Sequence, residues 1–194
     1  EIPLCGHATV ATAYVLSECL KAPGPVYRFE SKSGELRCTR EGDRFVLDFP
    51  ARPPAGALAV DEFSYALGAR PTAVFDGHYH LAVFETAAEI RALEPDFRKL
   101  SAIEHFAVIA TAPGDEGEDF VSRFFAPRAG IDEDPVTGSA HCVLTPYWAA
   151  RLGKTHLFAR QLSKRGGEVW CELAGDRVKM GGHAVLYLTG QIFV

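Results

Sequence analysis

The sequence has 194 residues, of which 47% are hydrophobic, so the chain is long enough to bury a sizeable core. It carries 20 basic and 25 acidic residues, and the absence of any basic run argues against nucleic acid or an anionic membrane as a partner. No apolar run has the length of a membrane-spanning helix, and the sequence shows no secretory signal pattern.

The cysteines indicate a reducing compartment. They are odd in number, widely scattered and without C-x-x-C spacing, which is typical of free thiols rather than of a disulfide scaffold or a zinc site. We therefore expect a cytoplasmic protein. The five residues are Cys5, Cys19, Cys38, Cys142 and Cys171.

Most of the chain has the alternating pattern of strands, with few helices between them. The first predicted element is a helix over His7–Leu20, apolar on nearly all sides and so expected to be buried. A surface helix is predicted over Ala87–Phe97, and a second buried helix over Ser139–Leu152, where Pro146 should cause a bend. The predicted strands are Val26–Ser31, Glu35–Arg40, Arg44–Phe49, Thr72–Phe75, His80–Glu85, Phe106–Ala112, Phe120–Ala126, Leu157–Ser163, Glu168–Leu173, Val178–Met180 and Ala184–Val194.

An internal repeat is the most informative feature of the sequence. When the chain is aligned with itself, one offset matches Glu1, Pro3, Gly6 and Ala8 with Glu133, Pro135, Gly138 and Ala140. An offset that is larger by one residue matches Gly34, Glu35, Cys38, Gly42, Asp43 and Arg44 with Gly167, Glu168, Cys171, Gly175, Asp176 and Arg177. Both copies therefore run in the same order: glycine turn, buried helix, strand, Gly-Glu turn, strand, Gly-Asp-Arg hairpin, strand.

The repeat predicts an α+β fold of two pseudo-symmetric halves, each a mostly antiparallel curved sheet or half-barrel around a central buried helix. We expect residues 1–56 to form part of the first half, 57–180 the second, and 181–194 a strand region returning to the first. Strands and a helix precede the second copy, whereas nothing precedes Glu1. We therefore expect the first half to be incomplete, and a further N-terminal segment of the same protein to be its partner.

A candidate site follows from the two helix starts, Gly6-His7 and Gly138-Ser139. A helix N-terminus presents unpaired N–H groups and a partial positive charge, which bind carboxylates and stabilise developing negative charge. Two such starts facing each other could hold a small carboxylate during proton transfer beside its carbonyl. Each turn alone would be equally consistent with a simple helix cap.

The stretch Ser122–Gly153 makes the chain resemble a known family. It contains S-R-F-F-A-P followed by G-I-D-E-D-P-V-T-G-S-A, which is similar to the second-domain signature of the PhzF-like isomerases of phenazine biosynthesis. Leu4–Ala8 resembles the first-domain partner of that signature, and Gln161–Val169 and Val178–Ile192 resemble the C-terminal strands. The resemblance implies a diaminopimelate-epimerase-like fold, a homodimer, an active site between the halves, and no cofactor or metal.

The resemblance also implies roles for individual residues. His7 and Asp134 would hold the substrate and assist proton movement, while Gly6, Gly138 and Ser139 would bind its carboxylate. The principal acid/base of the family is a glutamate in an Asn-Leu-Ser-Glu-type motif well upstream of the glycine-histidine turn. No such motif occurs here, so the resemblance implies that this chain alone lacks that group.

Several alternatives remain open at this point. The chain could be a non-catalytic module that binds small anions, or an interaction protein whose unpaired sheet edges seek a partner strand. A two-base epimerase or racemase would use Cys5 with a second thiol, but the repeat places Thr137 there, which cannot form a thiolate. His78 and His80 could form a metal pair, but spacing gives no third ligand, so we expect no metal.

Overall fold

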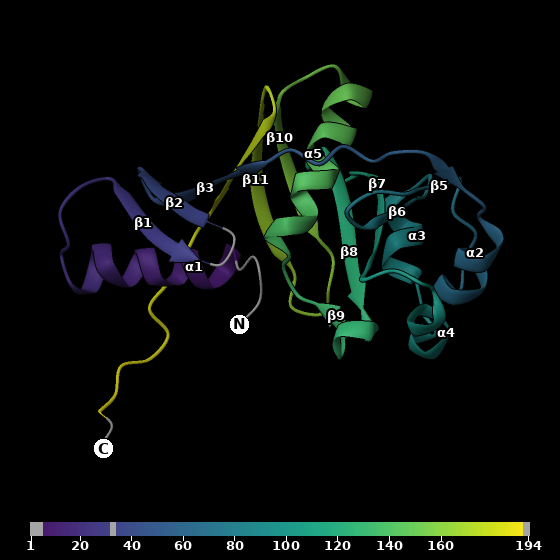
Figure 1. The fold of residues 1–194 in the computed structure, drawn as a ribbon, viewed down its shortest axis with the longest axis horizontal. Helices are drawn as coiled ribbons and strands as arrows, with labels where there is room; N and C mark the ends of the chain where they lie inside the picture. The colour runs from purple at the N-terminus through teal and green to yellow at the C-terminus, as the bar shows by residue number, and fades with distance from the viewer. Residues whose placement is uncertain (1–5, 32–33, 192–194) are drawn as a thin grey trace.

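The computed structural model describes residues 6–31 and 34–191, which form an α+β fold around one large open sheet (Figure 1). The helices are α1 (Gly6–Tyr14, continued by a π-helical segment, Val15–Cys19), α2 (Asp61–Leu67), α3 (Ala87–Ala92), α4 (Phe97–Ala102) and α5 (Gly138–Leu152), with a 3-10 turn at Pro127–Ala129. The strands are β1 (Val26–Ser31), β2 (Gly34–Glu41), β3 (Arg44–Pro50), β4 (Ala57–Leu58), β5 (Ala73–Phe75), β6 (His80–Val83), β7 (Val108–Pro113), β8 (Phe120–Ala126), β9 (Ile131–Asp134), β10 (His156–Gln161), β11 (Gly167–Ala174) and β12 (Arg177–Gly182).

The strands follow one another in the order β1-β2-β3-β12-β11-β10-β8-β7-β6-β5-β4, and β9 pairs with β8 outside this path. Neighbours are antiparallel except for the pairs β10–β8 and β6–β7. The predicted α+β class is therefore confirmed.

The internal repeat has a direct structural counterpart. The strands β1-β2-β3 and β10-β11-β12 are two antiparallel meanders, each preceded by a helix. The second hairpin of each meander turns through a Gly-Asp pair, in which Gly42 and Gly175 both have φ of 65°. Glycine adopts this conformation without the steric penalty of a side chain, which explains why both copies keep it.

The two meanders join edge to edge, so the sheet continues from one copy of the repeat to the other. Strand β3 pairs antiparallel with β12, from Phe45 opposite Gly182 to Pro50 opposite Arg177. The side chain of Arg177 reinforces this junction, because its Nε donates to Oδ1 of Asp48 at 2.9 Å.

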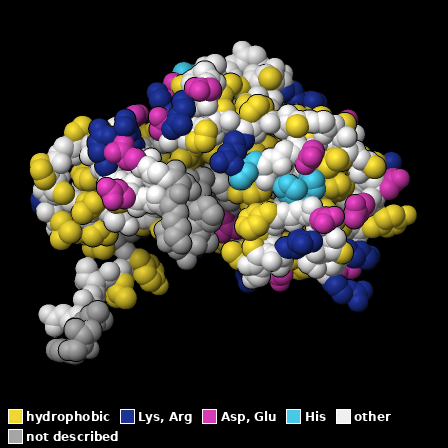
Figure 2. Space-filling view, viewed as in Figure 1, with side chains coloured by type: hydrophobic (Ala, Val, Ile, Leu, Met, Phe, Trp, Pro, Cys, Tyr) yellow, Lys and Arg dark blue, Asp and Glu magenta, His cyan; other side chains and the backbone are white. Residues whose placement is uncertain are grey.

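The two repeat helices differ in burial. In α5, Ala140, Cys142, Val143, Leu144 and Trp148 are at most 1% exposed, as predicted for a buried helix. By contrast, α1 buries only Gly6, Thr9 and Ala13 within Gly6–Tyr14, and the prediction that it is buried on nearly all sides is wrong for the described part of the chain. The reason is packing on one face: α1 contacts β2 and β3, and hydrophobic side chains remain visible over this region (Figure 2).

The proline inside α5 links the helix to the segment that connects the two meanders. Pro146 has no N–H, so the carbonyl of Cys142 loses its usual partner within the helix. The backbone N–H of Arg52 donates to that carbonyl at 2.8 Å. The segment that follows β3 is thus attached to α5 through the carbonyl that Pro146 leaves without a partner within the helix.

The predicted surface helix over Ala87–Phe97 begins at the predicted residue but is too long, because α3 ends at Ala92 and a separate helix, α4, begins at Phe97. The first, α3, begins with a capping box in which Thr86 and Glu89 exchange hydrogen bonds. Pro95 disfavours helical geometry at Glu94, and Asp96 then caps α4 by accepting from the backbone of Arg98 and Lys99. The sequence analysis also missed β4, α2 and β9.

The predicted strand Ala184–Val194 is not formed over residues 184–191, and its last three residues lie outside the described part of the chain. The backbone over residues 184–191 extends away from the sheet (Figure 1), and Tyr187 is 97% exposed. No helix among the described residues has the length and apolarity needed to cross a membrane.

Candidate active site

The two glycines at the starts of α1 and α5 lie against each other. A Cβ built on Gly6 would stand 3.7 Å from the Cα of Gly138, and the same distance holds in the reverse direction. Figure 1 shows the two helices beginning side by side near the middle of the molecule. The structure therefore brings together the two helix starts that the repeat paired, and glycine at both positions permits the close approach.

The amide groups at the start of α5 are open to an external acceptor. Thr137 is the N-cap residue, but its side chain makes no cap hydrogen bond. The first N–H groups of a helix have no intrahelical partner, and here no described side chain takes that place. The N–H groups of Gly138 and Ser139 thus lie at the positively polarised N-terminal end of a fifteen-residue helix.

Asp134 lies at the end of β9, one turn before α5. A register irregularity between β8 and β9 falls between Phe124 and Ala126, and Asp134 is opposite Phe124. Such bulges redirect side chains at sheet rims. The hydroxyl of Thr137 donates to Oδ2 of Asp134, so the carboxylate is held beside the first turn of α5.

The buried side chain of Gln161 fixes the turn from Asp134 to Thr137 through hydrogen bonds. Its side chain is 1% exposed, and its Oε1 accepts from the backbone N–H of Thr137 at 2.8 Å. Its Nε2 donates to the backbone oxygen of Asp134 at 2.6 Å and to Oγ1 of Thr137 at 3.2 Å. The sequence analysis did not single out Gln161, because a buried glutamine on a strand gives no local signal.

Ser139 contacts Tyr79, which belongs to the same hydrophobic cluster as the buried residues of α5. The phenolic oxygen of Tyr79 lies 2.9 Å from Oγ of Ser139. Burial raises the pKa of Tyr79, so the phenol stays protonated and can donate to Ser139 or to a bound anion. Tyr79 was also not predicted as a site residue from the sequence, in which it lies between His78 and His80, the two residues considered above as a metal pair.

His7 is exposed and lies in the first turn of α1, directly after Gly6. Its position follows from the contact between Gly6 and Gly138, which places the first turn of α1 next to the start of α5. Glu1 and Cys5, considered above, lie outside the described residues.

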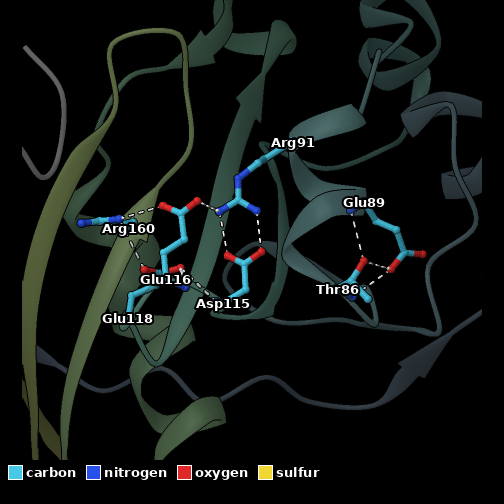
Figure 3. A network of polar contacts seen from close by, with 7 residues as sticks. All are labelled: Thr86, Glu89, Arg91, Asp115, Glu116, Glu118 and Arg160. Carbon is cyan, nitrogen blue, oxygen red and sulfur yellow. Dashed lines mark hydrogen bonds and ion pairs between the residues drawn. The ribbon is translucent and has the colours of Figure 1, made fainter.

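A separate polar cluster joins the 114–119 loop to α3 and β10 (Figure 3). Arg91 makes a two-pronged contact with Asp115, with both N–O distances 2.7 Å, and this pairing lowers the pKa of Asp115. Arg160 contacts Glu116 and Glu118 at 3.3 and 3.5 Å. Arg91 and Arg160 border a surface hollow of about 480 Å³, but carboxylates already neutralise both, so the hollow is a poor anion site.

A second hollow of about 650 Å³ includes Glu133 and Pro135, the two neighbours of Asp134. Neither of these hollows includes Gly6, His7, Gly138 or Ser139. We therefore place the candidate site where polar groups gather at the starts of α1 and α5, and not at either surface hollow.

Comparison with known proteins gives the family. The model of the phenazine biosynthesis-like (PhzC-PhzF) proteins matches residues 1–190. The chain belongs to the PhzC-PhzF family. This membership confirms the resemblance drawn from the Ser122–Gly153 signature.

Individual relatives agree with the family model. The chain is 52% identical over 193 residues to an uncharacterized isomerase of Pseudomonas aeruginosa, covering 99% of this chain and 74% of that protein. An uncharacterized isomerase of Halalkalibacterium halodurans is 38% identical over 199 residues, covering 100% of this chain and 75% of that one.

Solved structures extend the PhzC-PhzF comparison to the fold. A PhzF-family crystal structure from Enterococcus faecalis superposes with a TM-score of 0.96 at 40% identity, covering all of this chain and 75% of that one. A hydroxyproline epimerase from Agrobacterium vitis has a TM-score of 0.52 at 12% identity, covering 92% of this chain and 64% of that one. The second likeness shows that PhzC-PhzF proteins share their fold with epimerases.

Proposed function

We propose that the protein is a cofactor-independent isomerase that moves a proton within a small carboxylate-bearing substrate held between the starts of α1 and α5. The single observation that carries this proposal is the close approach of Gly6 and Gly138, in which a Cβ built on either glycine would stand 3.7 Å from the Cα of the other, so that two helix N-termini lie next to each other. Family membership and the isomerase names of its relatives support the reaction class.

The proposed chemistry uses the helix ends for charge and the side chains for protons. Removing a proton beside a carbonyl or carboxylate leaves an enolate-like negative charge, which N–H groups at helix ends stabilise. The amides of Gly138 and Ser139 would bind the carboxylate. Asp134, oriented by Thr137 and Gln161, would accept or return a proton, and His7 would assist from the other helix.

The arrangement gives less support to a two-base epimerase. Thr137 occupies the position of a second thiol, and its hydroxyl is already engaged with Asp134. A module that binds anions without catalysis remains the second candidate, because the amides of α5 need no acid or base to bind a carboxylate.

The test is deuterium exchange observed by NMR in D₂O. Unsaturated, α-hydroxy and α-amino carboxylic acids would be incubated with residues 1–194 and, in parallel, with the complete product of the gene. We expect one acid class to acquire deuterium at carbon, and Asp134→Asn to slow this by about 10² to 10⁴. Asp132→Asn is the matched control, because Asp132 is an exposed acid two positions away.

Binding and catalysis are separated in the same samples. Saturation-transfer contacts to a carboxylate without deuterium uptake in either protein would refute the isomerase and favour the binding module. Equal exchange rates in Asp134→Asn and in the unmodified protein would refute the role of Asp134.

We also propose that the protein acts as a cytoplasmic homodimer, as the family resemblance implies. The exposed apolar side chains of Val185, Leu186 and Leu188 give it surface to bury against another chain. Light scattering across a concentration series tests this, and a monomer at all concentrations of the complete gene product would overturn it.

A further inference from the structure

A histidine-carboxylate cluster lies on the side of β6 away from the candidate active site. Side-chain ligand atoms of Asp76, His80 and His105 all lie within 4.8 Å of one another. Asp76 and His80 flank the turn from β5 into β6, and His105 precedes β7. The sequence analysis paired His78 with His80, but Nε2 of His78 instead lies 2.9 Å from Nη1 of Arg52.

His80 presents a buried nitrogen without a hydrogen bond. The residue is 8% exposed, and no described residue forms a hydrogen bond with its Nδ1. Oδ1 of Asp76 lies 3.3 Å away, close enough for an ion pair but outside hydrogen-bond geometry. Such an unsatisfied buried atom is costly and indicates a missing partner.

The distance between these two atoms suits a shared metal ion. Ligand bonds of about 2.0–2.2 Å at a tetrahedral angle separate two donor atoms by about 3.3–3.6 Å. The backbone N–H of Gly77 donates to Oδ1 of Asp76 at 2.8 Å and so orients the carboxylate.

The surroundings of His105 favour a cation as well. Its ring is tilted by 35° against that of His80, with centroids 3.9 Å apart. Its Nε2 lies 3.1 Å from the carbonyl oxygen of Gly77, and its Nδ1 lies 3.3 Å from that of Ala107. These carbonyl oxygens place partial negative charge beside the ring, and a bound metal ion would replace the contact at one of the two nitrogens.

We propose that Asp76, His80 and His105 bind one divalent first-row transition-metal ion. Two imidazoles and one carboxylate suit Zn²⁺, Fe²⁺, Co²⁺ or Ni²⁺, whereas Mg²⁺ and Ca²⁺ prefer oxygen ligands alone. The ion would link the β5–β6 turn to the segment before β7. Tyr79 belongs to the β5–β6 turn, and its ring lies 6.0 Å from that of Phe106 in the segment before β7, so the ion would also order the residue that contacts Ser139.

The test is a Co²⁺ titration of the chelator-treated full chain, followed by competition with Zn²⁺. We expect one equivalent of Co²⁺ with visible d–d absorption and no thiolate charge-transfer band. His105→Gln and Asp76→Ala should each weaken binding by at least about tenfold. Zn²⁺ should raise the Tm of the unmodified protein and leave the Tm of both variants unchanged.

His183→Gln is the matched control, because His183 makes a surface contact of 3.2 Å with Asp43 and no third ligand stands beside this pair among residues 6–31 and 34–191. Its metal affinity should equal that of the unmodified protein. Absence of saturable binding, or equal affinity in His105→Gln and the unmodified protein, would overturn the proposal. A cluster that only takes up a proton would show a pH-dependent shift of the His105 resonances that Zn²⁺ does not alter, which would also overturn it.

Discussion

The phenolic oxygen of Tyr79 lies 2.9 Å from the hydroxyl oxygen of Ser139, although the two residues are 60 positions apart in the chain. One comes from the loop before β6 and the other from the first turn of α5. The contact fixes the side chain of Ser139, which we propose binds the substrate carboxylate, and the energy of this contact can be measured without knowing the substrate.

We expect Tyr79→Phe and Ser139→Ala each to lower the free energy of unfolding by about 1 kcal/mol. Because the two side chains share one hydrogen bond, the double variant should lose less than the sum, with a coupling energy of about 1 kcal/mol. Urea unfolding of all four proteins measures this. Additive losses would show that the hydroxyls do not interact, and Tyr65→Phe, at a 74% exposed tyrosine, should have no effect.

Gln161→Leu should loosen the turn that carries Asp134. The substitution leaves the N–H of Thr137 and the backbone oxygen of Asp134 without their side-chain partner. We expect a loss of about 3 kcal/mol and faster amide hydrogen exchange at Thr137. Gln191→Leu, at an exposed position, is the control. Unchanged exchange at Thr137 in Gln161→Leu would contradict the assigned role.

Two arginines should differ sharply in their effect on stability. Arg123 is 12% exposed, makes a two-pronged contact with Glu133, and donates to the carbonyl oxygens of Ile90 and Leu93. Arg123→Ala leaves Glu133 as a largely buried, unpaired charge, and should cost about 3–5 kcal/mol. Arg91→Ala breaks an equally well-formed contact whose partners are 36% and 46% exposed, and should cost less than about 1 kcal/mol. Similar losses in denaturant melts of the two variants would refute this ranking.

His141 should make the protein less stable in mild acid. Complete burial lowers its pKa from 6.5 to about 4, although its Nδ1 contacts the backbone oxygen of Thr137. The unfolded chain therefore binds a proton more readily than the folded one between these two values. The stabilisation is complete above pH 6.5 and is lost as the pH falls toward 4, by roughly 3 kcal/mol.

Unfolding free energies measured across this range check the pH prediction. His141→Gln should reduce the slope, while His156→Gln, at an exposed histidine, should leave it unchanged. Burial also lowers the pKa values of His78 and His80, so these two residues also make the folded protein less stable as the pH falls. Part of the pH dependence of the unfolding free energy should therefore remain in His141→Gln. An equal slope in His141→Gln and the unmodified protein would assign the effect to other groups.

The sequence predicted those parts of the fold that depend on local pattern. Both Gly-Asp hairpins and the two repeat helices follow from turn chemistry and periodicity, and the strand Val26–Ser31 agrees to the residue. The failures have identifiable causes. Pro95 and the cap at Asp96 were overlooked in the predicted helix, and Ala184–Val194 alternates like a strand but forms none over residues 184–191.

At the candidate site, the sequence identified the residues of the two helix starts, because glycine turns and the family signature are local features. It did not find Tyr79 or Gln161. Both act through contacts with residues at least 24 positions away, and a single sequence contains no direct record of such pairs.

The pairing of β3 with β12 has a consequence for synthesis. Asp48 and Arg177 meet across 129 positions, so β3 has no partner on that side until the ribosome has added almost the whole intervening chain. At typical translation rates this takes on the order of ten seconds. During that interval the first meander presents an unpaired strand edge to its surroundings, which makes the nascent chain a substrate for chaperones before it is a folded protein.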